Sequence, residues 1–413
     1  MKDVEILITG AGPAGVATSL FLSKLKIPHT IIDKACFPRD KICGDALSGK
    51  VVQVLNKIDP EIINEISENL NQYTGSYGLC FFAPNGKKLE VPFSMKPNML
   101  KNAPGYISRR INFDNFLFNK IDKQFANVKQ QTELVEVVRE DDGIIAHLKN
   151  SGGNYQKKFT LIVGADGDRS LVSKKLNPTK KNLTHYCAAI RAYYTGVKGT
   201  HENNFIELHF IKDLLPGYFW IFPMNDGSAN VGIGMLSEVV AKKKINLRKK
   251  MEEIICSHPS IKNRFVNAKL EGEIYGWGLP LGSAHRSLSG DNFLLTGDAG
   301  SLIDPFTGEG IGNALLSGMF AAERISEAIV ANKFDKEFLS GYEKKIYLSL
   351  QKELRLSRSI QKLAQNAWLF NLVVNKAIKN KTLRETMTCM FDDIDIRDRL
   401  RKPSFYFKLL VNG

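Results

Sequence analysis

The sequence predicts an α/β protein in three parts: an interrupted α/β domain, a β-rich domain inserted into it, and a helical region at the C-terminus. A strand–helix–strand pattern with a glycine-rich turn opens the chain, strand-like segments dominate the middle, and the pattern is mostly helical from about residue 309 to about residue 390. With 413 residues, of which 43% are hydrophobic, the chain is long and apolar enough for two or three domains.

The opening pattern consists of three segments. Residues 4–9 form a short apolar run typical of a buried strand, a helical pattern runs from Pro13 to about Lys26, and a second strand over 29–33 ends at Asp33. This is a βαβ unit, so we expect the two strands to be parallel neighbours in one sheet.

The turn between the first strand and the helix is rich in glycine, and its residues are Gly10, Ala11, Gly12, Pro13, Ala14 and Gly15. Gly10 permits a tight turn, Gly12 lets the backbone approach a pyrophosphate, and Gly15 allows close packing of helix on strand. Asp33 is placed to accept hydrogen bonds from ribose hydroxyls, which favours FAD or NAD over NADP. This unit therefore predicts a dinucleotide-binding site.

Two later segments also end a strand with an acidic residue before a helix. Residues 161–170 contain Asp166, and residues 293–312 contain Gly297 and Asp298 followed by a loop rich in proline and glycine. A carboxylate at a strand end suits the hydroxyls of an extended linker, and a helix N-terminus suits a ring that gains negative charge on reduction. Asp166 can equally be read as a helix cap.

Together the three segments resemble the FAD-binding signatures of the p-hydroxybenzoate hydroxylase-type flavoprotein superfamily. The resemblance implies a Rossmann-type FAD-binding domain in which Asp298 binds the ribityl chain or pyrophosphate and residues 305–311 face the isoalloxazine. It also matches Arg110, rather than the adjacent Arg109, to an arginine that contacts the FAD linker. The cofactor contacts implied are Gly10, Gly12, Pro13, Ala14, Gly15, Asp33, Lys34, Cys43, Gly44, Arg110, Asp166, Gly297, Asp298, Pro305, Gly308, Glu309, Gly310 and Ile311.

Two further motifs narrow the resemblance. The segments Phe-Pro-Arg-Asp-Lys-Ile-Cys-Gly-Asp (37–45) and Tyr-Phe-Trp-Ile-Phe-Pro (218–223) look like those of the geranylgeranyl reductase family, and Gly-Leu-Pro (278–280) is also similar. The resemblance covers roughly residues 1–330. It implies an FAD-dependent reduction of isolated C=C bonds in a polyprenyl chain.

The residues that would contact substrate follow from this resemblance. Tyr218, Trp220 and Phe222 alternate along one strand, so their rings share one face, and the family match makes that face, with Trp277, the wall of a prenyl site. From spacing alone the same alternation is a plain sheet core.

Two further residues are candidates for catalysis. An isolated alkene is a poor hydride acceptor, so a proton donor is required. Cys43 is the candidate donor, with Lys41 beside it to lower its pKa. The alternative for Cys43 is a small residue that packs beside the cofactor.

The source of electrons stays open. There is no second dinucleotide motif, but members of the superfamily bind nicotinamide cofactors transiently, so we expect NAD(P)H or a ferredoxin-type protein as the reductant. Two other readings compete with a reductase: a monooxygenase or halogenase of the same superfamily, against which the Pro-Arg-x-Lys-x-Cys-Gly segment argues, and an FAD-binding protein without catalytic activity.

From motif placement we expect an FAD-binding domain over 1–75, 100–180 and 285–330, an inserted β-rich substrate domain over 76–99 and 181–284, and a basic helical region over 331–413. The formal net charge is +14, and more than half of it lies in 331–413, with 17 Lys and Arg against 9 Asp and Glu.

Residues 344–381 concentrate this charge, with nine basic residues and one acid, Glu353. Apolar residues are interleaved among them: Leu350, Leu354, Ile360, Leu363, Trp368, Leu369 and Phe370. This pattern is typical of a helix on an anionic membrane surface, or of a helix that packs its apolar face on the FAD domain.

The remaining expectations concern partners and location. No apolar run approaches the roughly 18–20 residues of a spanning helix, the N-terminus lacks the pattern of a secretory signal, and the six cysteines show no metal-binding spacing. We therefore expect a cytoplasmic monomer, peripheral on the inner face of the membrane, with free thiols and no metal. No recognition motif accompanies the charge, so nucleic acid is not expected as a partner.

Overall fold

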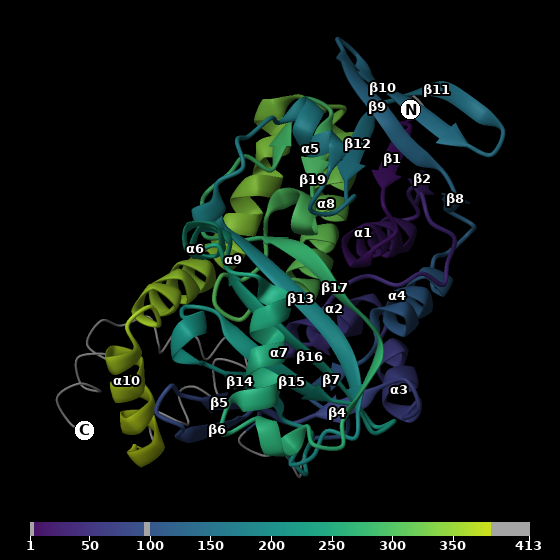
Figure 1. Cartoon of the computed structure of the whole chain (residues 1–413). Helices are drawn as coiled ribbons and strands as arrows, with labels where there is room; N and C mark the ends of the chain where they lie inside the picture. The colour runs from purple at the N-terminus through teal and green to yellow at the C-terminus, as the bar shows by residue number, and fades with distance from the viewer. Residues whose placement is uncertain (1–3, 95–99, 381–413) are drawn as a thin grey trace.

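The computed structural model describes residues 4–94 and 100–380, and its architecture is built on two large sheets (Figure 1). The first has six strands in the order β18-β19-β12-β1-β2-β8. These strands are β1 (Ile6–Thr9), β2 (His29–Ile32), β8 (Ala126–Lys129), β12 (Leu161–Gly164), β18 (Ser289–Gly290) and β19 (Phe293–Leu295). All neighbours pair in parallel except the edge strand β18. The predicted interruption is thus real, since segments from both halves of the chain share one sheet.

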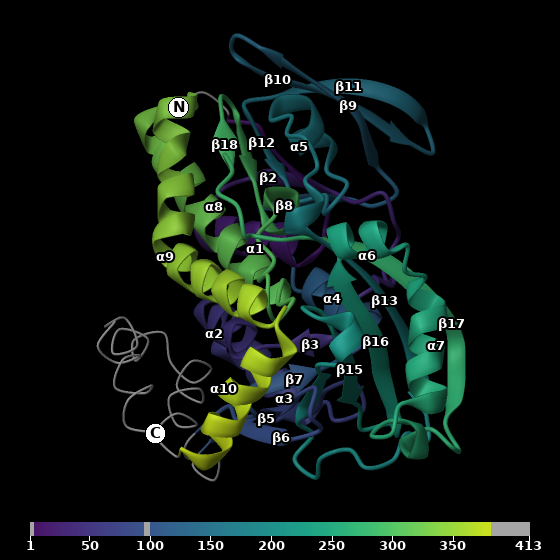
Figure 2. The same cartoon turned by 60° about the vertical axis from the view of Figure 1, so that its left-hand side comes forward.

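The two faces of this sheet bury different partners, because successive side chains of a strand point to opposite sides. Ile6 and Ile8 pack with helices α1 (Pro13–Lys24) and α8 (Ile311–Ala331). Leu7 packs instead against a three-stranded antiparallel sheet of β9 (Glu133–Glu140), β10 (Gly143–Asn150) and β11 (Gly153–Phe159). That smaller sheet projects from the upper end of the molecule in Figures 1 and 2.

The second large sheet has seven strands in the order β17-β13-β16-β15-β14-β5-β6. Its strands are β5 (Gly78–Phe82), β6 (Lys88–Pro92), β13 (Tyr186–Thr195), β14 (Ile206–His209), β15 (Tyr218–Pro223), β16 (Ser228–Leu236) and β17 (Lys269–Pro280). Every pair is antiparallel except β14 with β5. Strands β5 and β6 form a hairpin that joins this sheet through the pairing of β5 with β14, more than 120 residues later in the chain.

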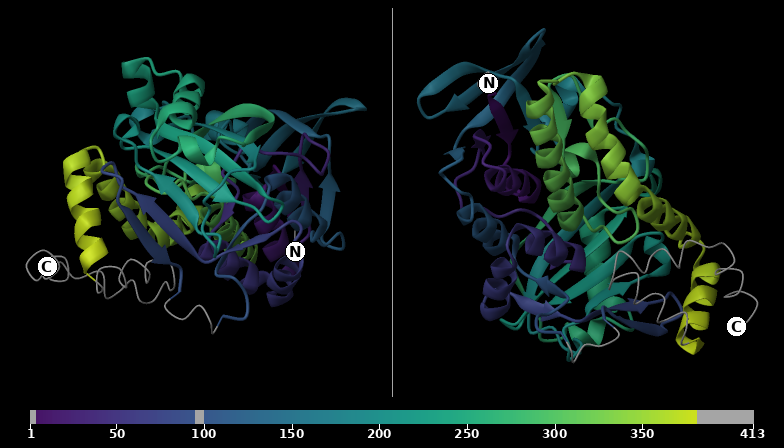
Figure 3. Two further views of the ribbon diagram at one scale, coloured as in Figure 1. Left: turned by 60° about the horizontal axis from the view of Figure 1, so that its bottom comes forward. Right: turned by 180° about the vertical axis from the view of Figure 1, so that it is seen from behind.

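Helices cover this second sheet on both sides. Phe219 and Ile221 of β15 pack toward α7 (Leu247–Ser257), whereas Trp220 and Phe222 of the same strand pack toward α10 (Ala367–Lys379). Helix α9 (Lys336–Leu363) lies along α8 and along β18, the edge strand of the first sheet, and then leads to α10 (Figure 2 and the right-hand view of Figure 3). The C-terminal helices therefore bridge the two sheets.

The remaining elements are short. Helices α2 (Gly49–Ile58), α3 (Pro60–Glu68) and α4 (Arg110–Asn119) pack near α1, and β3 (Ala46–Leu47), β4 (Thr74–Ser76) and β7 (Gly105–Ile107) form a small antiparallel sheet. Helix α5 (Leu171–Leu176) follows β12, and α6 (Ser237–Lys243) precedes α7.

Two local features shape these elements. Lys244 adopts a left-handed backbone conformation with φ of 52° and ends α6 before α7 begins. Strands β9 and β10 pair as an antiparallel hairpin. The helical pattern predicted to about residue 390 holds to Lys379, and residues 381–390 lie outside the described part.

Candidate active site

One large cavity, of about 1530 Å³, joins the two sheets. It begins at the carboxyl ends of β1 and β12, passes the loop that contains Cys43, and reaches helices α9 and α10. Most of the residues predicted for cofactor, substrate and catalysis line it: Gly10, Gly12, Pro13, Ala14, Asp33, Lys34, Lys41, Cys43, Gly44, Arg110, Asp166, Tyr218, Trp220, Phe222, Trp277, Asp298, Gly308, Glu309, Gly310 and Ile311. Gly15, Gly297 and Pro305 are not among the lining residues, so their predicted contacts with a ligand are not supported.

The glycine-rich turn has no room for side chains. Gly10 has φ of 93°, and a Cβ there would lie 2.5 Å from the carbonyl oxygen of Ala165. A Cβ at Gly15 would lie 1.9 Å from the carbonyl oxygen of Gly10. Gly15 therefore acts through packing of α1 on β1, as its position in the motif predicts.

The two predicted acids at this end are held by backbone amides. Asp33 accepts from the N–H of Ala11 at 2.8 Å and from that of Ala35 at 2.9 Å. Asp166 Oδ2 accepts at 2.7 Å from the N–H of Leu171, the first residue of α5, whose N-cap residue is Ser170. The Oδ1 of Asp166 is buried without a hydrogen-bond partner in the described structure, and burial raises the pKa of the carboxyl.

Two helices direct their N-termini into the cavity. Helix α1 begins after Gly12 and α8 after Gly310, and neither N-cap residue caps through its side chain. The positive end of the helix dipole therefore faces the cavity at both places, although at α8 the Gly312 N–H already donates to Glu309 Oε1 at 2.9 Å. Asp298 stands between them, and burial raises its pKa although Lys41 opposes that shift.

These features fit FAD. The narrow glycine turn and the α1 N-terminus suit a pyrophosphate, Asp33 suits a ribose, and the unpartnered Oδ1 of Asp166 is a buried acceptor that a bound hydroxyl would satisfy. The α8 N-terminus and residues 308–311 would lie against the isoalloxazine, where the helix dipole favours the reduced ring.

The loop from Arg39 to Asp45 lines the cavity where its dinucleotide end meets its apolar end. Arg39 and Arg110 both bind the buried carboxylate of Asp114, each with a contact of 2.6 Å. Arg110 is thereby fixed at the cavity wall, whereas Arg109 turns away to Glu271, at 2.6 Å. Of the two neighbouring arginines, Arg110 therefore lies at the cavity and Arg109 does not, and the contact of Arg110 with FAD stays a prediction.

Lys41 and Cys43 occupy the same loop. The Lys41 Nζ lies 3.9 Å from the ring centroid of Trp277, and burial lowers its pKa to about 8. The Cys43 side chain lies beside the Arg110 guanidinium and raises its pKa. Both predicted catalytic residues are therefore at the cavity.

The aromatic wall predicted on β15 faces the cavity. Tyr218, Trp220 and Phe222 have neighbouring ring centroids 6.2 Å apart, and Gly44 sits so close that a Cβ on it would lie 3.1 Å from the Phe222 ring. The Tyr218 hydroxyl donates to the carbonyl oxygen of Thr307, which ties the wall to the loop before α8.

The rest of the apolar lining was not predicted as part of the site. It comes from α9 and α10, which the sequence analysis placed in the basic helical region, and from the β5–β6 hairpin. The apolar residues that form it are Leu79, Phe81, Leu89, Phe93, Leu356, Ile360, Leu363, Phe370 and Val374. The spacing of 356, 360 and 363 marks one helical face, and that is the signal that sequence reasoning could have used.

The lone acid of the basic stretch also faces inward. The Lys50 Nζ, almost fully buried, donates to Glu353 at 3.0 Å and to Asn313 at 2.6 Å, and lies 3.7 Å from Glu309. This cluster ties α9 to α2 and α8. Because α9 carries part of the apolar wall, the cluster also positions that wall.

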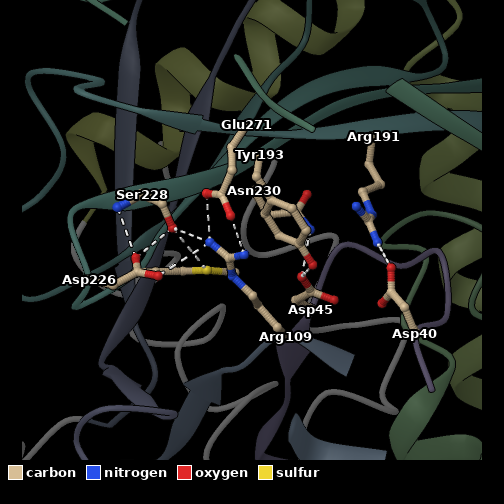
Figure 4. A network of polar contacts seen from close by, with 10 residues as sticks. Asp40, Asp45, Arg109, Arg191, Tyr193, Asp226, Ser228, Asn230 and Glu271 are labelled. Carbon is tan, nitrogen blue, oxygen red and sulfur yellow. Dashed lines mark hydrogen bonds and ion pairs between the residues drawn. The ribbon is translucent and has the colours of Figure 1, made fainter. Parts of the chain in front are cut away.

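A second polar network lies behind the Cys43 loop (Figure 4). Asp45 is fully buried and binds Tyr193 and Asn230, and Arg191 binds Asp40 at 2.6 Å. Sequence analysis identified none of the residues that contact Asp45, because they come from separate strands of the second sheet.

Comparison with known proteins agrees with this site. A family model described as FAD binding domain matches residues 3–346. Among solved structures, a geranylgeranyl bacteriochlorophyll reductase-like protein of Thermoplasma acidophilum superposes with a TM-score of 0.72 and 23% identity, covering 91% of this chain and 96% of that one. A flavin-dependent brominase superposes with a TM-score of 0.75 and 20% identity, covering 94% of each. Fold, cradle and family match define an FAD-dependent oxidoreductase.

Curated relatives specify the family further. The digeranylgeranylglycerophospholipid reductase of Methanococcus vannielii is 30% identical over 370 residues, 88% of each chain. The menaquinone reductase of Mycolicibacterium smegmatis is 27% identical and covers 79% of this chain and 78% of its own. The chain belongs to the geranylgeranyl reductase family, which confirms the resemblance seen in the sequence motifs.

Proposed function

We propose that this protein uses FAD to reduce isolated C=C bonds in the polyprenyl chain of a membrane lipid. The observation that carries the proposal is the continuity of the cavity: one space joins the dinucleotide cradle to an apolar chamber between β15 and helices α9 and α10. The reductases among the curated relatives carry names that specify a geranylgeranylated glycerophospholipid or a menaquinone, both of which have prenyl chains.

The residues around the chamber suit this reaction. When bound, reduced FAD supplies a hydride to an alkene carbon. The aromatic and aliphatic walls hold an uncharged chain and exclude water, and Tyr218 links the substrate wall to the loop beside the isoalloxazine. We further propose that the predicted FAD contacts that line the cavity hold the cofactor, and that Lys41 and Cys43 border the reacting carbons.

The test starts with purified enzyme loaded with FAD and reduced with dithionite under anaerobic conditions. A lipid with geranylgeranyl chains is added, and mass spectrometry of the product looks for gains of two hydrogens. We expect such gains together with flavin reoxidation. If product forms only when oxygen is admitted, and carries oxygen or halogen, a monooxygenase or halogenase explains the fold instead.

The reductant is tested in the same system. NADH, NADPH and a reduced ferredoxin are each offered in place of dithionite, and bleaching of the flavin absorbance is followed. We propose that at least one of them reduces the bound flavin. If no donor, dithionite included, reduces it, the protein is an FAD-binding protein without redox activity.

We also propose that the lipid enters from a membrane surface at α9 and α10. No helix in the described parts of the chain is both long and apolar enough to cross a bilayer. Leu350, Leu354 and Phe370 of the basic stretch are buried, so they pack on the protein as one of the two interpretations expected. Trp368 and Leu348, however, are 71% and 85% exposed, and Lys344, Lys345 and Lys352 lie within about one helical turn of Leu348.

Flotation with vesicles tests this proposal. We expect the protein to float with vesicles that contain anionic lipid, and Trp368→Ser to float less, because a ring at the headgroup level is lost. Val330→Ser is the matched control, since Val330 is 87% exposed on α8, outside the lining of the cavity. Equal flotation of both variants would contradict the proposed docking face.

A further inference from the structure

The proposed reduction needs a proton as well as a hydride, and the structure contains a carboxyl group suited to provide it. Asp45 follows Cys43 and Gly44 and lines the cavity, yet its side chain is fully buried. Its φ of 70° is a left-handed conformation that aspartate adopts more readily than most residues and that the surrounding fold must stabilise.

The two oxygens of Asp45 have different environments (Figure 4). Oδ2 accepts from the Tyr193 hydroxyl at 2.6 Å and from Asn230 Nδ2 at 2.8 Å. Oδ1 is buried and has no hydrogen-bond partner among the described residues. Because Oδ2 already accepts from two donors, the proton of the neutral acid resides on Oδ1.

The orientation of Asn230 is fixed from its other side. The Trp220 indole N–H donates to Asn230 Oδ1 at 2.9 Å, so the amide nitrogen must face Asp45 and the Cys43 carbonyl oxygen, to which it donates at 2.9 Å. Trp220 belongs to the aromatic wall. Asp45 is thus held at a fixed place relative to the surface that would bind the prenyl chain.

We propose that Asp45 is the general acid of the reaction and donates the proton on Oδ1 to an alkene carbon. This inference rests on the proposed function. One alkene carbon would gain a hydride from the anionic reduced flavin (FADH⁻), and the other would gain the proton as the Asp45 O–H bond breaks, which would leave a saturated bond, oxidised flavin and an Asp45 carboxylate. The carboxylate regains its proton from water before the next cycle. A proton that is to be transferred to carbon should not already be donated to a nitrogen or oxygen acceptor. Oδ1 has no hydrogen-bond partner among the described residues, so a proton on it meets this condition.

Burial brings the pKa of Asp45 much closer to neutral pH than that of an exposed aspartate, although the neighbouring charges oppose this shift. Burial raises its pKa to about 6, against the opposing hydrogen bonds of Tyr193 and Asn230 and the charges of Arg191 and Arg110. Arg191 is itself paired with Asp40, which reduces its effect on Asp45. A substrate chain in the cavity would exclude more water and favour the neutral form further.

The first experiment compares three variants in single turnover. In Asp45→Asn the amide oxygen can take the place of Oδ2 and accept from the same two donors, but the amide nitrogen cannot release a proton. We expect flavin reoxidation by a prenyl lipid to slow by about 100-fold or more, while reoxidation by ferricyanide, which forms no C–H bond, stays at the wild-type rate.

Two controls make this result specific. Asp226→Asn makes the same chemical change in the neighbouring Arg109 network, outside the cavity, and should leave lipid reduction intact. Cys43→Ala removes the competing donor and should retain more activity than Asp45→Asn. If Asp45→Asn reduces lipid at the wild-type rate, the inference is wrong and the proposed function stands. If wild-type enzyme reduces no prenyl lipid, both are wrong.

The second experiment does not require that the Asp45→Asn variant folds. Lipid reduction should fall as the pH rises through the pKa of the acid, and Tyr193→Phe, which removes a donor to the carboxylate, should raise that pKa and move the fall to higher pH by roughly one unit. Difference infrared spectroscopy should follow the same group in enzyme without substrate, as a protonated carboxyl band that disappears on the same pH scale. An unmoved profile and band in Tyr193→Phe would overturn the inference.

Discussion

The two ends of the cavity are built by different means. At the dinucleotide end, backbone atoms and helix N-termini of three strand–turn–helix segments form the surface, and glycines keep it open. At the apolar end, the surface of the cavity is formed by side chains from β5, β15, α9 and α10, and each of these elements contributes only part of the lining. The dinucleotide end is therefore shaped by backbone geometry, whereas the apolar end is shaped by packed side chains.

The largest effect is expected from a single methyl group at the dinucleotide end. Gly10→Ala places a Cβ 2.5 Å from the carbonyl oxygen of Ala165, so the turn must open, and we expect FAD affinity to fall by about 100-fold or more. Flavin fluorescence titration of the apoprotein measures this. Gly86→Ala is the control, because Gly86 also has positive φ but has open space around it. Equal FAD affinity in both variants would show that backbone shape does not decide cofactor binding.

At the apolar end we expect a loss of turnover with FAD retained. Trp220→Ala removes the central ring of the aromatic wall and the donor that orients Asn230, so kcat/KM for a prenyl lipid should fall by roughly 10–100-fold. Trp220→Phe keeps a ring without the N–H and should lie between this variant and the wild type. Loss of bound FAD from Trp220→Ala, measured by absorbance, would contradict the separation of the two ends.

The Lys50–Glu353 ion pair, which links α9 to α2, is expected to contribute to stability. Glu353→Ala removes the carboxylate that binds the buried Lys50, and we expect the free energy of unfolding to fall by about 1–3 kcal/mol. Glu323→Ala removes the exposed ion pair with Lys345 and should cost less than about 1 kcal/mol. Urea unfolding of both variants gives the comparison. A Glu353 variant no less stable than the Glu323 variant would mean that packing alone holds α9.

The last expected effect is a change of stability with pH and concerns Lys41, which lies between the two ends. Its pKa in the folded protein is lowered to about 8 from 10.5, so between these values the unfolded chain binds more protons and stability should rise with pH. Lys41→Met lacks this contribution. The free energy of unfolding of the wild type, minus that of Lys41→Met, should therefore increase from pH 8 to pH 10. A flat difference would indicate that Lys41 is solvated and not buried against Trp277.

The same contrast explains what could be predicted from the sequence. Each predicted FAD segment is short and continuous in sequence. It joins the end of a strand to the start of a helix, as at β1–α1 and β19–α8, so its residue pattern alone determines the local backbone geometry. Tyr218, Trp220 and Phe222 could be placed on one face because strand alternation requires it.

Sequence reasoning missed the residues whose partners are distant. Asp45 binds Tyr193 and Asn230 across 148 and 185 residues, and Glu353 meets Lys50 across 303. Helical periodicity predicted one apolar face on α9 and left open whether that face would meet a membrane or the FAD domain; Leu350 and Leu354 pack on the FAD domain. The membrane interpretation of Leu350 and Leu354 fails for that reason, while it stays a prediction for Trp368.

The cradle for FAD also has a consequence for the order in which the protein is made. Its parts follow β1, β12 and β19, and the last of them, the start of α8, lies some 300 residues after the first. During synthesis the cofactor site cannot close until residue 311 has left the ribosome, so FAD cannot guide the folding of the N-terminal half. Contacts of such long range form slowly. FAD then adds its binding free energy to a nearly complete chain, so cofactor supply governs how long the finished protein persists.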